Sequence, residues 1–346
     1  MTQARHSEQV NRSIAALCED WHARNNAAWG IYERASRRNI FQNGKNRYDA
    51  GMKPVVSVII GTYNQRDVLQ RVLTAYNSQS AAIPFEVIIV DSSSTDGTDG
   101  MIRGFHAKFI LRHMVQANAG KAAARNRGVH DAKADIIVVT DADMVPHERF
   151  VQTHFEAHRG TQQPKCFEGL TYNLTRLHWP PEPDLLHPYM RHQPRPGAEL
   201  GWFYFLTGNI SFPKSVFLEA GGFSPDFTGY GWEDLELGYR LYKDGVPLVY
   251  LPTAINYHYH VVTDADEIQR NVAKGQSAKV FLKKHPELRW FLGLNPLSVF
   301  VYRTTSPRGI LYRLMEKATH LPPRNIFHRL GVWFLKEYHY LSGALS

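Results

Sequence analysis

Cysteine is scarce in this chain. Only Cys18 and Cys166 occur among the 346 residues, and no C-x-x-C spacing is present. Two isolated thiols cannot build a disulfide framework or a cysteine-rich zinc site, and so low a cysteine content favours a reducing compartment. We therefore expect a cytoplasmic protein.

Long apolar runs are absent as well. No segment approaches the ~18 consecutive apolar residues that a membrane-spanning helix needs. The polar stretch from Met1 to Asp20 contains no apolar core of the length found in signal peptides. Any contact with a membrane is therefore expected to be peripheral, on its inner face.

Strand-like and helix-like patterns alternate from residue 55 to residue 140. Short β-branched runs bounded by polar residues are typical of strands that are buried on both faces. Such runs occupy residues 55–60, 85–90, 109–115 and 136–140, and helical spacing is found between them at residues 66–76 and 120–130. Strands separated by helices imply right-handed crossovers and a mainly parallel sheet. The predicted fold class is therefore α/β, a Rossmann-like sheet flanked by helices.

Polar clusters follow three of these strands. They are Thr62-Tyr63-Asn64, Asp91-Ser92-Ser93 and Asp141-Ala142-Asp143. Ligands of open parallel sheets bind at the carboxyl ends of the strands, so the clusters are expected to meet at one edge. The carboxylates of Asp141 and Asp143 suit Mg²⁺ or Mn²⁺, which prefer a few carboxylate oxygens together with phosphate oxygens. An ordinary acidic turn is the alternative interpretation, because D-x-D also occurs by chance.

A second acidic cluster is expected at the start of a helix. Residues 229–232 lead into Glu233 and Asp234, and the apolar spacing of residues 235–243 predicts a helix that ends before Gly245. The helix dipole stabilises charged acids in a first turn. Asp234 could then accept a proton from a nucleophile, and an exposed Trp232 could stack on a sugar ring. A plain helix start is the alternative, because acids commonly begin helices.

Together these motifs resemble those of family 2 glycosyltransferases of the GT-A fold. The resemblance covers about residues 53–262. It rests on six segments in the family's order, at residues 55–64, 90–98, 118–126, 141–143, 221–223 and 231–234. The later part is also similar to bacterial chondroitin-type polymerases, animal polypeptide N-acetylgalactosaminyltransferases and β-1,4-galactosyltransferases. The resemblance implies a catalytic domain over residues 53–262, between an N-terminal helical extension and linker (1–52) and a basic, mainly helical C-terminal region (263–346).

The resemblance implies a transferase that moves a sugar from a nucleoside diphosphate, with uridine as the leading base, to a glycan, lipid-linked or peptide acceptor. The implied donor nucleotide-binding residues are Thr62, Tyr63, Asn64, Asp91, Ser93, Gly120, Lys121, Arg125 and Asp141. Among them, Asp91 would hydrogen-bond the uracil or ribose, while Lys121 and Arg125 would lie near the base and diphosphate. The family usually has a second acid where this chain has Ser92, so the pocket could read the base differently.

The resemblance also implies a metal cofactor, Mn²⁺ or Mg²⁺. Asp143 would be a direct ligand, and Asp141 would reach the ribose or, through water, the metal. His258 is the preferred further ligand. His260 is the alternative, because both could lie on the same face of a strand.

For the reaction, the resemblance implies a single displacement that inverts the anomeric carbon. Asp234 would act as the base, and Glu233 with Trp232 would position the donor sugar or the acceptor. The opposite wall is assigned to Trp202, Phe203, Gly208 and Asn209. Residues 202–205 could equally be a strand of the core.

Two other functions compete with this interpretation. A nucleotidyltransferase that makes sugar nucleotides would usually have a Gly-rich basic loop after the first strand, where this chain reads Gly-Thr-Tyr-Asn-Gln-Arg. A non-catalytic carbohydrate- or nucleotide-binding module would more plausibly have lost Asp143 or Asp234. Nucleic acid is not expected as a partner, because the excess positive charge lies in the C-terminal region.

The last quarter of the chain carries most of the formal charge of +8. Residues 263–346 contain 13 Lys and Arg against 6 Asp and Glu, interleaved with large apolar residues. This pattern is typical of a helix on an anionic membrane surface. It also fits amphipathic helices that pack on the catalytic domain, and a surface that docks the acceptor, so all three interpretations stay open.

Overall fold

The computed structural model describes residues 52–182, 185–190 and 192–346. The chain divides into two units, residues 1–46 and 47–346, and all described residues belong to the second. The predicted N-terminal extension over residues 1–52 therefore lies outside the described residues, except for Met52.

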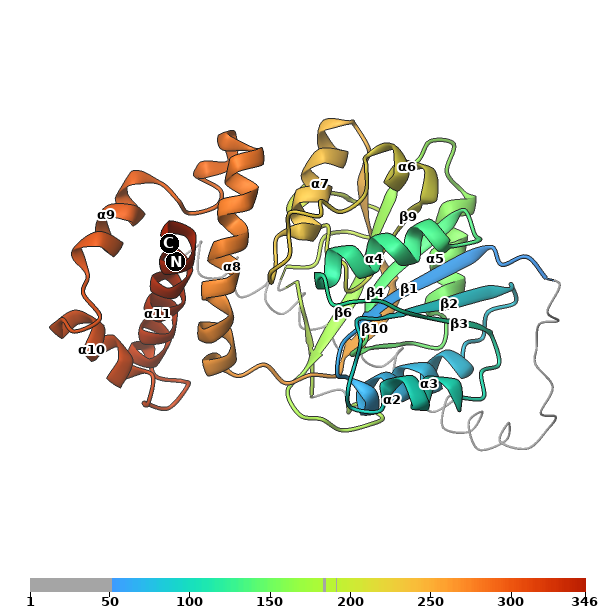
Figure 1. Ribbon diagram of the computed structural model, residues 1–346, viewed down its shortest axis with the longest axis horizontal. Coiled ribbons are helices and arrows are strands. Elements are labelled where there is room, and N and C mark those ends of the chain that lie inside the picture. Colours follow the sequence, from blue (N-terminus) through green and yellow to red (C-terminus); the bar gives the residue numbers. More distant parts are fainter. Residues whose placement is uncertain (1–51, 183–184, 191) are drawn as a thin grey trace, which may run out of the picture. The chain divides into compact units, whose positions relative to one another are not determined.

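Four parallel strands form the first half of a ten-stranded sheet, in the order β3-β2-β1-β4 (Figure 1). Their bounds are β1 Val56–Thr62, β2 Phe85–Asp91, β3 Ile110–Val115 and β4 Ile136–Asp141. Every residue of β2 is buried, as expected of a β-branched run covered on both faces. The register pairs Thr62 with Asp91 and Gly61 with Asp141, so the three polar clusters do end at one edge.

The second half of the sheet mixes strand directions, which the sequence pattern did not predict. β9 (Ile210–Pro213) runs antiparallel between β4 and β6 (Cys166–Leu174). β10 (Leu248–His258) is parallel to β6 and antiparallel to β5 (Met144–Pro146). Two short strands, β7 Leu186–Pro188 and β8 Glu199–Leu200, add to β6 and β10. The sheet as a whole remains a GT-A-like α/β arrangement flanked by helices, as predicted.

Helices cover both faces of the sheet. One face packs against α4 (Gly120–Asp131), α6 (Lys214–Glu219) and α7 (Glu233–Lys243). The other packs against α2 (Arg66–Asn77), α3 (Thr98–Arg103) and α5 (Phe150–Arg159). The predicted stripe of α2 is buried as expected of an amphipathic helix. Six residues are too few to show a helical period, and α3 was therefore missed.

The C-terminal region (residues 263–346) consists of helices α8 Asp264–Lys284, α9 Pro296–Thr304, α10 Ile310–Ala318 and α11 Ile326–Leu345, with a short 3₁₀ helix at Pro286–Arg289. Thr263 begins α8 in a reciprocal capping box with Asp266. α8 and α11 approach closely because glycines stand at their crossing. A Cβ atom on Gly275 would collide with the carbonyl of Tyr340.

A third apolar cluster joins this region to the sheet region (residues 53–262). Phe227 and Tyr239 of the sheet region pack there with Phe281 of α8 and Tyr340 of α11. The Tyr239 hydroxyl also donates to Glu287, 2.9 Å away. Among the described helices, none combines the length and the apolar content needed to cross a bilayer.

Candidate active site

The carboxyl end of β1 forms the first wall of the site. Thr62 is buried, and its hydroxyl has no hydrogen-bond partner among the described residues. The next residue, Tyr63, is 49% exposed. A buried hydroxyl without a partner beside an exposed ring suits a ligand that has both polar groups and a flat base.

The loop after β2 is held by its own side chains. The Oδ1 atom of buried Asp91 accepts hydrogen bonds from the backbone and the hydroxyl of Ser94, at 3.0 and 2.6 Å. Asn64 accepts from a backbone N–H of this loop at 2.8 Å, and the Ser93 hydroxyl donates to the Gln116 carbonyl at 2.7 Å. Asn64 and Ser93 both have positive φ angles, 52° and 60°. These two residues therefore shape the loop, and a direct nucleotide contact by them remains a prediction.

Arg125 links the two acidic clusters. Its guanidinium donates to Oδ1 of Asp141 at 2.7 Å and to Oε1 of Glu233 at 2.8 Å. The Arg125 side chain is only 2% exposed. The observed partners of the guanidinium are thus two carboxylates, and the position of Arg125 near the donor base and diphosphate remains a prediction. Because one group holds both carboxylates, the start of α7 lies beside the carboxyl end of β4.

Lys121 is the freer cation at this edge. Its ammonium lies 3.4 Å from Oδ2 of Asp141 and is about half exposed. Burial alone would raise the pKa of Asp141, but Lys121 and Arg125 outweigh it and hold that pKa below its usual range. Gly120 has φ +87°, and a Cβ atom there would lie 3.1 Å from the Thr228 carbonyl. Glycine thus allows α4 to begin directly against the loop before α7.

Asp143 and His258 face each other across the turn between β4 and β5. Oδ2 of Asp143 lies 3.5 Å from Nε2 of His258. Nδ1 of His258 lies 3.0 Å from Oδ1 of Asn173, and with Nδ1–H as the donor of this contact Nε2 is free to bind a cation beside Asp143. Metal-ligating histidines usually have such a second hydrogen bond. The donor set therefore fits a divalent cation.

His260 is oriented differently. Its Nε2 atom pairs with the Arg270 guanidinium at 3.3 Å. Of the two predicted alternatives, His258 is thus the one beside Asp143. The Asp141 carboxylate contacts Lys121 and Arg125 instead. Within the described part of the chain, no group of three or more His, Cys, Asp or Glu side chains is arranged to hold a metal.

Asp234 lies on the first turn of α7, as predicted. Its Oδ1 atom accepts the Leu235 backbone N–H at 2.8 Å. Burial and the neighbouring charge of Glu233 raise the pKa of Asp234 to about 7. Burial and the charge of Glu233 thus act against the stabilisation of the charged form that a first-turn position predicts. A carboxyl group with a pKa near 7 can accept a proton at neutral pH.

The two tryptophans predicted at the sugar-binding surface are less accessible than expected. Trp232 is half-buried, and its indole N–H donates to the Lys274 carbonyl of α8 at 3.0 Å. The expectation of a freely exposed ring is wrong because α8 covers one side of it. Trp202 begins a 3₁₀ helix rather than a core strand, and its ring lies 4.5 Å from that of Phe291. Phe203 beside it is exposed.

Gly208 and Asn209 differ in exposure just before β9. The Asn209 side chain is fully buried, and its amide donates to the carbonyls of Leu170 and Ala254, at 3.2 and 2.9 Å. The predicted contact of this side chain with acceptor or sugar is therefore corrected to a structural role. Gly208 is half-buried and its carbonyl accepts the Thr140 hydroxyl at 2.9 Å, so its place in the acceptor wall remains a prediction.

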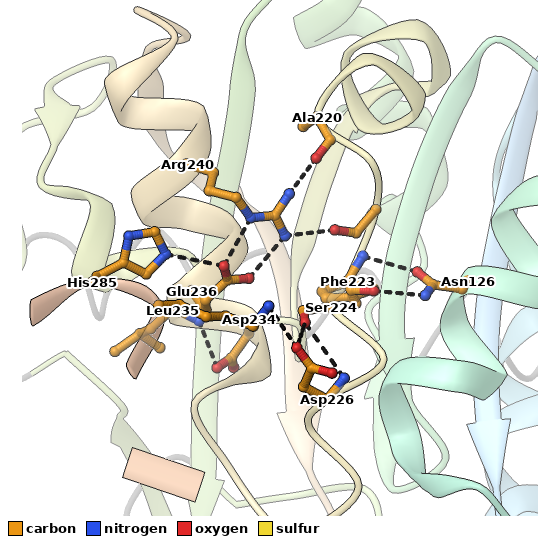
Figure 2. A network of polar contacts seen from close by, with 12 residues as sticks. Asn126, Ala220, Phe223, Ser224, Asp226, Asp234, Leu235, Glu236, Arg240 and His285 are labelled. Carbon is orange, nitrogen blue, oxygen red and sulfur yellow. Dashed lines mark hydrogen bonds and ion pairs between the residues drawn. The ribbon is translucent and has the colours of Figure 1, made fainter. Parts of the chain in front are cut away.

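A network that the sequence did not reveal fixes the loop before α7 (Figure 2). Asn126 of α4 binds both backbone groups of Phe223, at 2.8 and 2.9 Å. Arg240 of α7 donates to the Gly222 carbonyl at 2.6 Å and makes two hydrogen bonds to buried Glu236. His285 of the C-terminal region also reaches Glu236, at 3.1 Å. The spacing of Glu236 and Arg240 predicted their pairing, but no local pattern predicted that Asn126 and Arg240 would hold the loop.

The sheet order, the helices on both faces and the acidic edge define a GT-A fold. Residues 57–183 match the family model described as "Glycosyl transferase family 2", and residues 189–264 match the one described as "N-terminal domain of galactosyltransferase". Residues 57–183 therefore match the family 2 glycosyltransferases, as the sequence motifs predicted.

Curated relatives agree with this family. The chain is 32% identical over 223 residues to a validoxylamine A glucosyltransferase of Streptomyces hygroscopicus subsp. jinggangensis, an overlap of 56% of this chain and 53% of that protein. It is 26% identical over 291 residues to a chondroitin synthase of Pasteurella multocida, covering 72% of this chain and 30% of that protein. The chain thus spans about half of the first relative's length and less of the second.

Among solved structures, a mannosyltransferase from Pyrobaculum calidifontis in complex with GDP-Man and Mn²⁺ has a similar fold. The match has a TM-score of 0.51 and 18% identity, and covers 93% of this chain and 95% of that one. At this identity the likeness concerns the fold alone.

Proposed function

We propose that this chain is an inverting, metal-dependent glycosyltransferase that moves a sugar from a nucleoside diphosphate to an acceptor hydroxyl. The observation that carries the proposal is the double contact of Arg125 with Asp141 and Glu233. It brings the acid of the strand edge and the first turn of α7 to one place. Asp234, the neighbour of Glu233, is then well situated to act on a substrate bound at that edge.

For the donor, we infer a UDP-sugar. The exposed ring of Tyr63 can stack on a base, and the unpartnered hydroxyl of Thr62 can accept or donate a hydrogen bond at the ribose. Asp143 and His258 would hold Mn²⁺ or Mg²⁺ together with diphosphate oxygens. A bound cation would offset the charge that grows on the leaving diphosphate. Lys121 can add a further positive charge there, because it is partly exposed.

For the acceptor, Asp234 is the proposed base. The acceptor oxygen forms a bond to the anomeric carbon, the bond to the diphosphate breaks, and the acceptor proton passes to Asp234. One displacement inverts the anomeric centre. Arg125 and Glu233 fix the start of α7, so they position the base rather than react.

The test is a panel of nucleotide sugars with Mn²⁺, in which release of the nucleoside diphosphate is followed. Slow hydrolysis needs no acceptor, so it is measurable while the acceptor is unknown. We expect one UDP-sugar to be cleaved faster than its GDP counterpart, and cleavage to stop when the metal is chelated. If cleavage continued undiminished in excess chelator, the proposed metal dependence would be wrong. If a GDP-sugar were preferred, the proposed uridine nucleotide would be wrong.

We also propose that the C-terminal region binds an anionic membrane surface. Each of its last three helices exposes an apolar stripe, and no residue of α9 or α10 is buried. We name these side chains the α9–α11 apolar set: Leu297, Phe300, Val301, Ile310, Leu311, Leu314, Ile326, Phe327, Leu330 and Trp333. Stripes of this kind on a soluble surface usually mark an interaction site.

The charge around the α9–α11 apolar set favours a membrane as its partner. Six basic side chains accompany one acid, Glu316, and none of the six forms an ion pair with a described residue. They are Arg303, Arg308, Arg313, Lys317, Arg324 and Arg329. Unpaired cations interleaved with aromatic and aliphatic side chains match anionic headgroups above an acyl layer. A neutral protein partner would leave these cations without counter-charges.

A further inference from the structure

Helix α8 packs against the segment that leads into Asp234. The Trp232 indole N–H binds the Lys274 carbonyl, and a Cβ atom on Gly229 would lie 3.2 Å from the Ser277 hydroxyl oxygen. The Lys274 ammonium lies 5.0 Å from the centre of the Trp232 ring. One turn earlier, the Arg270 guanidinium lies 5.7 Å from the centre of the Tyr230 ring. Two cations of the C-terminal region thus stand over the aromatic lead-in to the proposed base.

The two cations over this lead-in are half-buried. Neither Arg270 nor Lys274 forms an ion pair with a described residue, although Arg270 contacts Nε2 of His260 at 3.3 Å. Of the nearby acids, Glu267 is bound by Lys336, and the charges of Glu267 and Glu337 act on Lys274 without a direct contact. Burial lowers the pKa of Lys274, and Asp234 is the acid whose charge acts most strongly against that shift. Half-buried cations that lack a directly bound carboxylate are costly, so an anion that reaches them gains a strong interaction.

Aromatic groups complete this side of the site. The pKa of Tyr189 is raised by desolvation of its hydroxyl and by the charge of Asp234, although the residue as a whole is exposed. Tyr189 and Tyr230 are both exposed. The exposed Tyr230 ring beside the Arg270 guanidinium suits a sugar that carries a negative charge.

We propose that Arg270 and Lys274 form a subsite for an anionic acceptor, one that carries a phosphate or carboxylate group near the hydroxyl to be glycosylated. The inference rests on the proposed function, because it takes Asp234 as the base. The donor diphosphate is assigned to the opposite side, at Lys121, Asp143 and His258. The C-terminal region would then select the acceptor as well as cover the site.

The test is direct binding, which needs no turnover. Saturation-transfer NMR is recorded on the full chain with glucose 6-phosphate, methyl glucuronoside and methyl glucoside. The wild type is expected to bind at least one charged sugar about tenfold more tightly than the neutral one. The double variant Arg270→Met/Lys274→Met should lose this preference, and Arg270→Lys/Lys274→Arg should keep it. The responsive probe tells whether phosphate or carboxylate is recognised.

The matched control is Lys283→Met, which removes an exposed lysine from the same helix. It should keep the preference for the charged sugar. Equal binding of charged and neutral sugars by the wild type, or an equal loss in the control, would overturn the subsite. Donor hydrolysis separates this inference from the proposed function. If the protein hydrolyses a nucleotide sugar but shows no preference for the charged sugar, only the subsite proposal is wrong. If it prefers the charged sugar but hydrolyses no nucleotide sugar, the glycosyltransferase proposal is wrong.

Discussion

Charges are handled in opposite ways by the sheet region and the C-terminal region. In the sheet region, buried charges satisfy one another: Arg125 binds Asp141 and Glu233, and Arg240 binds Glu236. In α9–α11, by contrast, six basic side chains between residues 303 and 329 form no ion pair with described residues and stand among exposed apolar groups, whereas Lys336 further along α11 binds Glu267. The difference teaches that the sheet region is organised around its own electrostatics, whereas most of the basic side chains in α9–α11 are left without an acidic partner among the described residues.

The largest expected effect comes from the acid at the metal-binding edge. Asp143→Ala should lower metal-dependent cleavage of the donor by about 10³-fold, because the leaving diphosphate loses the charge that a held cation supplies. Asp135→Ala is the control, since it removes an exposed acid at the other end of β4. The measurement is nucleoside diphosphate release with varied Mn²⁺. Equal activity of the two variants would show that Asp143 is not needed for metal-dependent cleavage of the donor.

Breaking the two ion pairs of Arg125 should also have a large effect, in this case on the free energy of unfolding. Arg125→Met leaves the carboxylates of Asp141 and Glu233 buried without their shared partner, so unfolding free energy should fall by about 3–5 kcal/mol. Arg127→Met, two residues further on α4 and exposed, should change it by about 0.5 kcal/mol. Urea unfolding measures both. Similar losses of unfolding free energy in the two variants would show that the ion pairs of Arg125 do not stabilise the fold more than an exposed arginine does.

A smaller effect is expected from pH. The raised pKa of Asp234, about 7, means that the basic form is lost as pH falls through this value. Between about pH 7 and about pH 5, kcat/KM should drop roughly tenfold per pH unit, and above about pH 8 it should level off. The same profile for Asp234→Glu should keep its shape with a shifted midpoint. A flat profile across this range would argue against a titrating base at position 234.

The smallest effect on turnover is expected from the α9–α11 apolar set. Ile310→Ser/Trp333→Ser should reduce cosedimentation with vesicles of phosphatidylcholine and phosphatidylglycerol, and hardly change hydrolysis of the donor in solution. Leu218→Ser is the control, an exposed apolar residue of α6. Binding should also need phosphatidylglycerol and weaken with salt. Binding to pure phosphatidylcholine would refute the electrostatic part, and a concentration-dependent dimer without vesicle binding would identify a second copy as the partner.

Local patterns were enough to predict the half of the fold that comes first. β-Branched runs gave β1 to β4, and the residues that follow three of them meet at one edge because parallel strands end together. The first-turn position of Asp234 was also predictable, since the helical spacing after it is regular.

Long-range contacts explain what could not be predicted. Arg125 and Glu233 lie 108 positions apart, so no spacing rule could reveal their ion pair. Trp232 looked exposed because nothing local indicates that α8 will pack on it. Asn209 resembled a site residue, yet it is fully buried and its amide joins strands. Motifs thus locate a site, while burial decides which of its residues are free to act.

The account depends most on Asp234, and Asp234→Asn tests it directly. Asparagine keeps the size and the hydrogen bond from Leu235 but cannot take a proton. Mn²⁺-dependent binding of UDP, measured by calorimetry, should stay close to wild type, while transfer falls by about 10²–10⁴-fold. Transfer at the wild-type rate would contradict the assignment of the base.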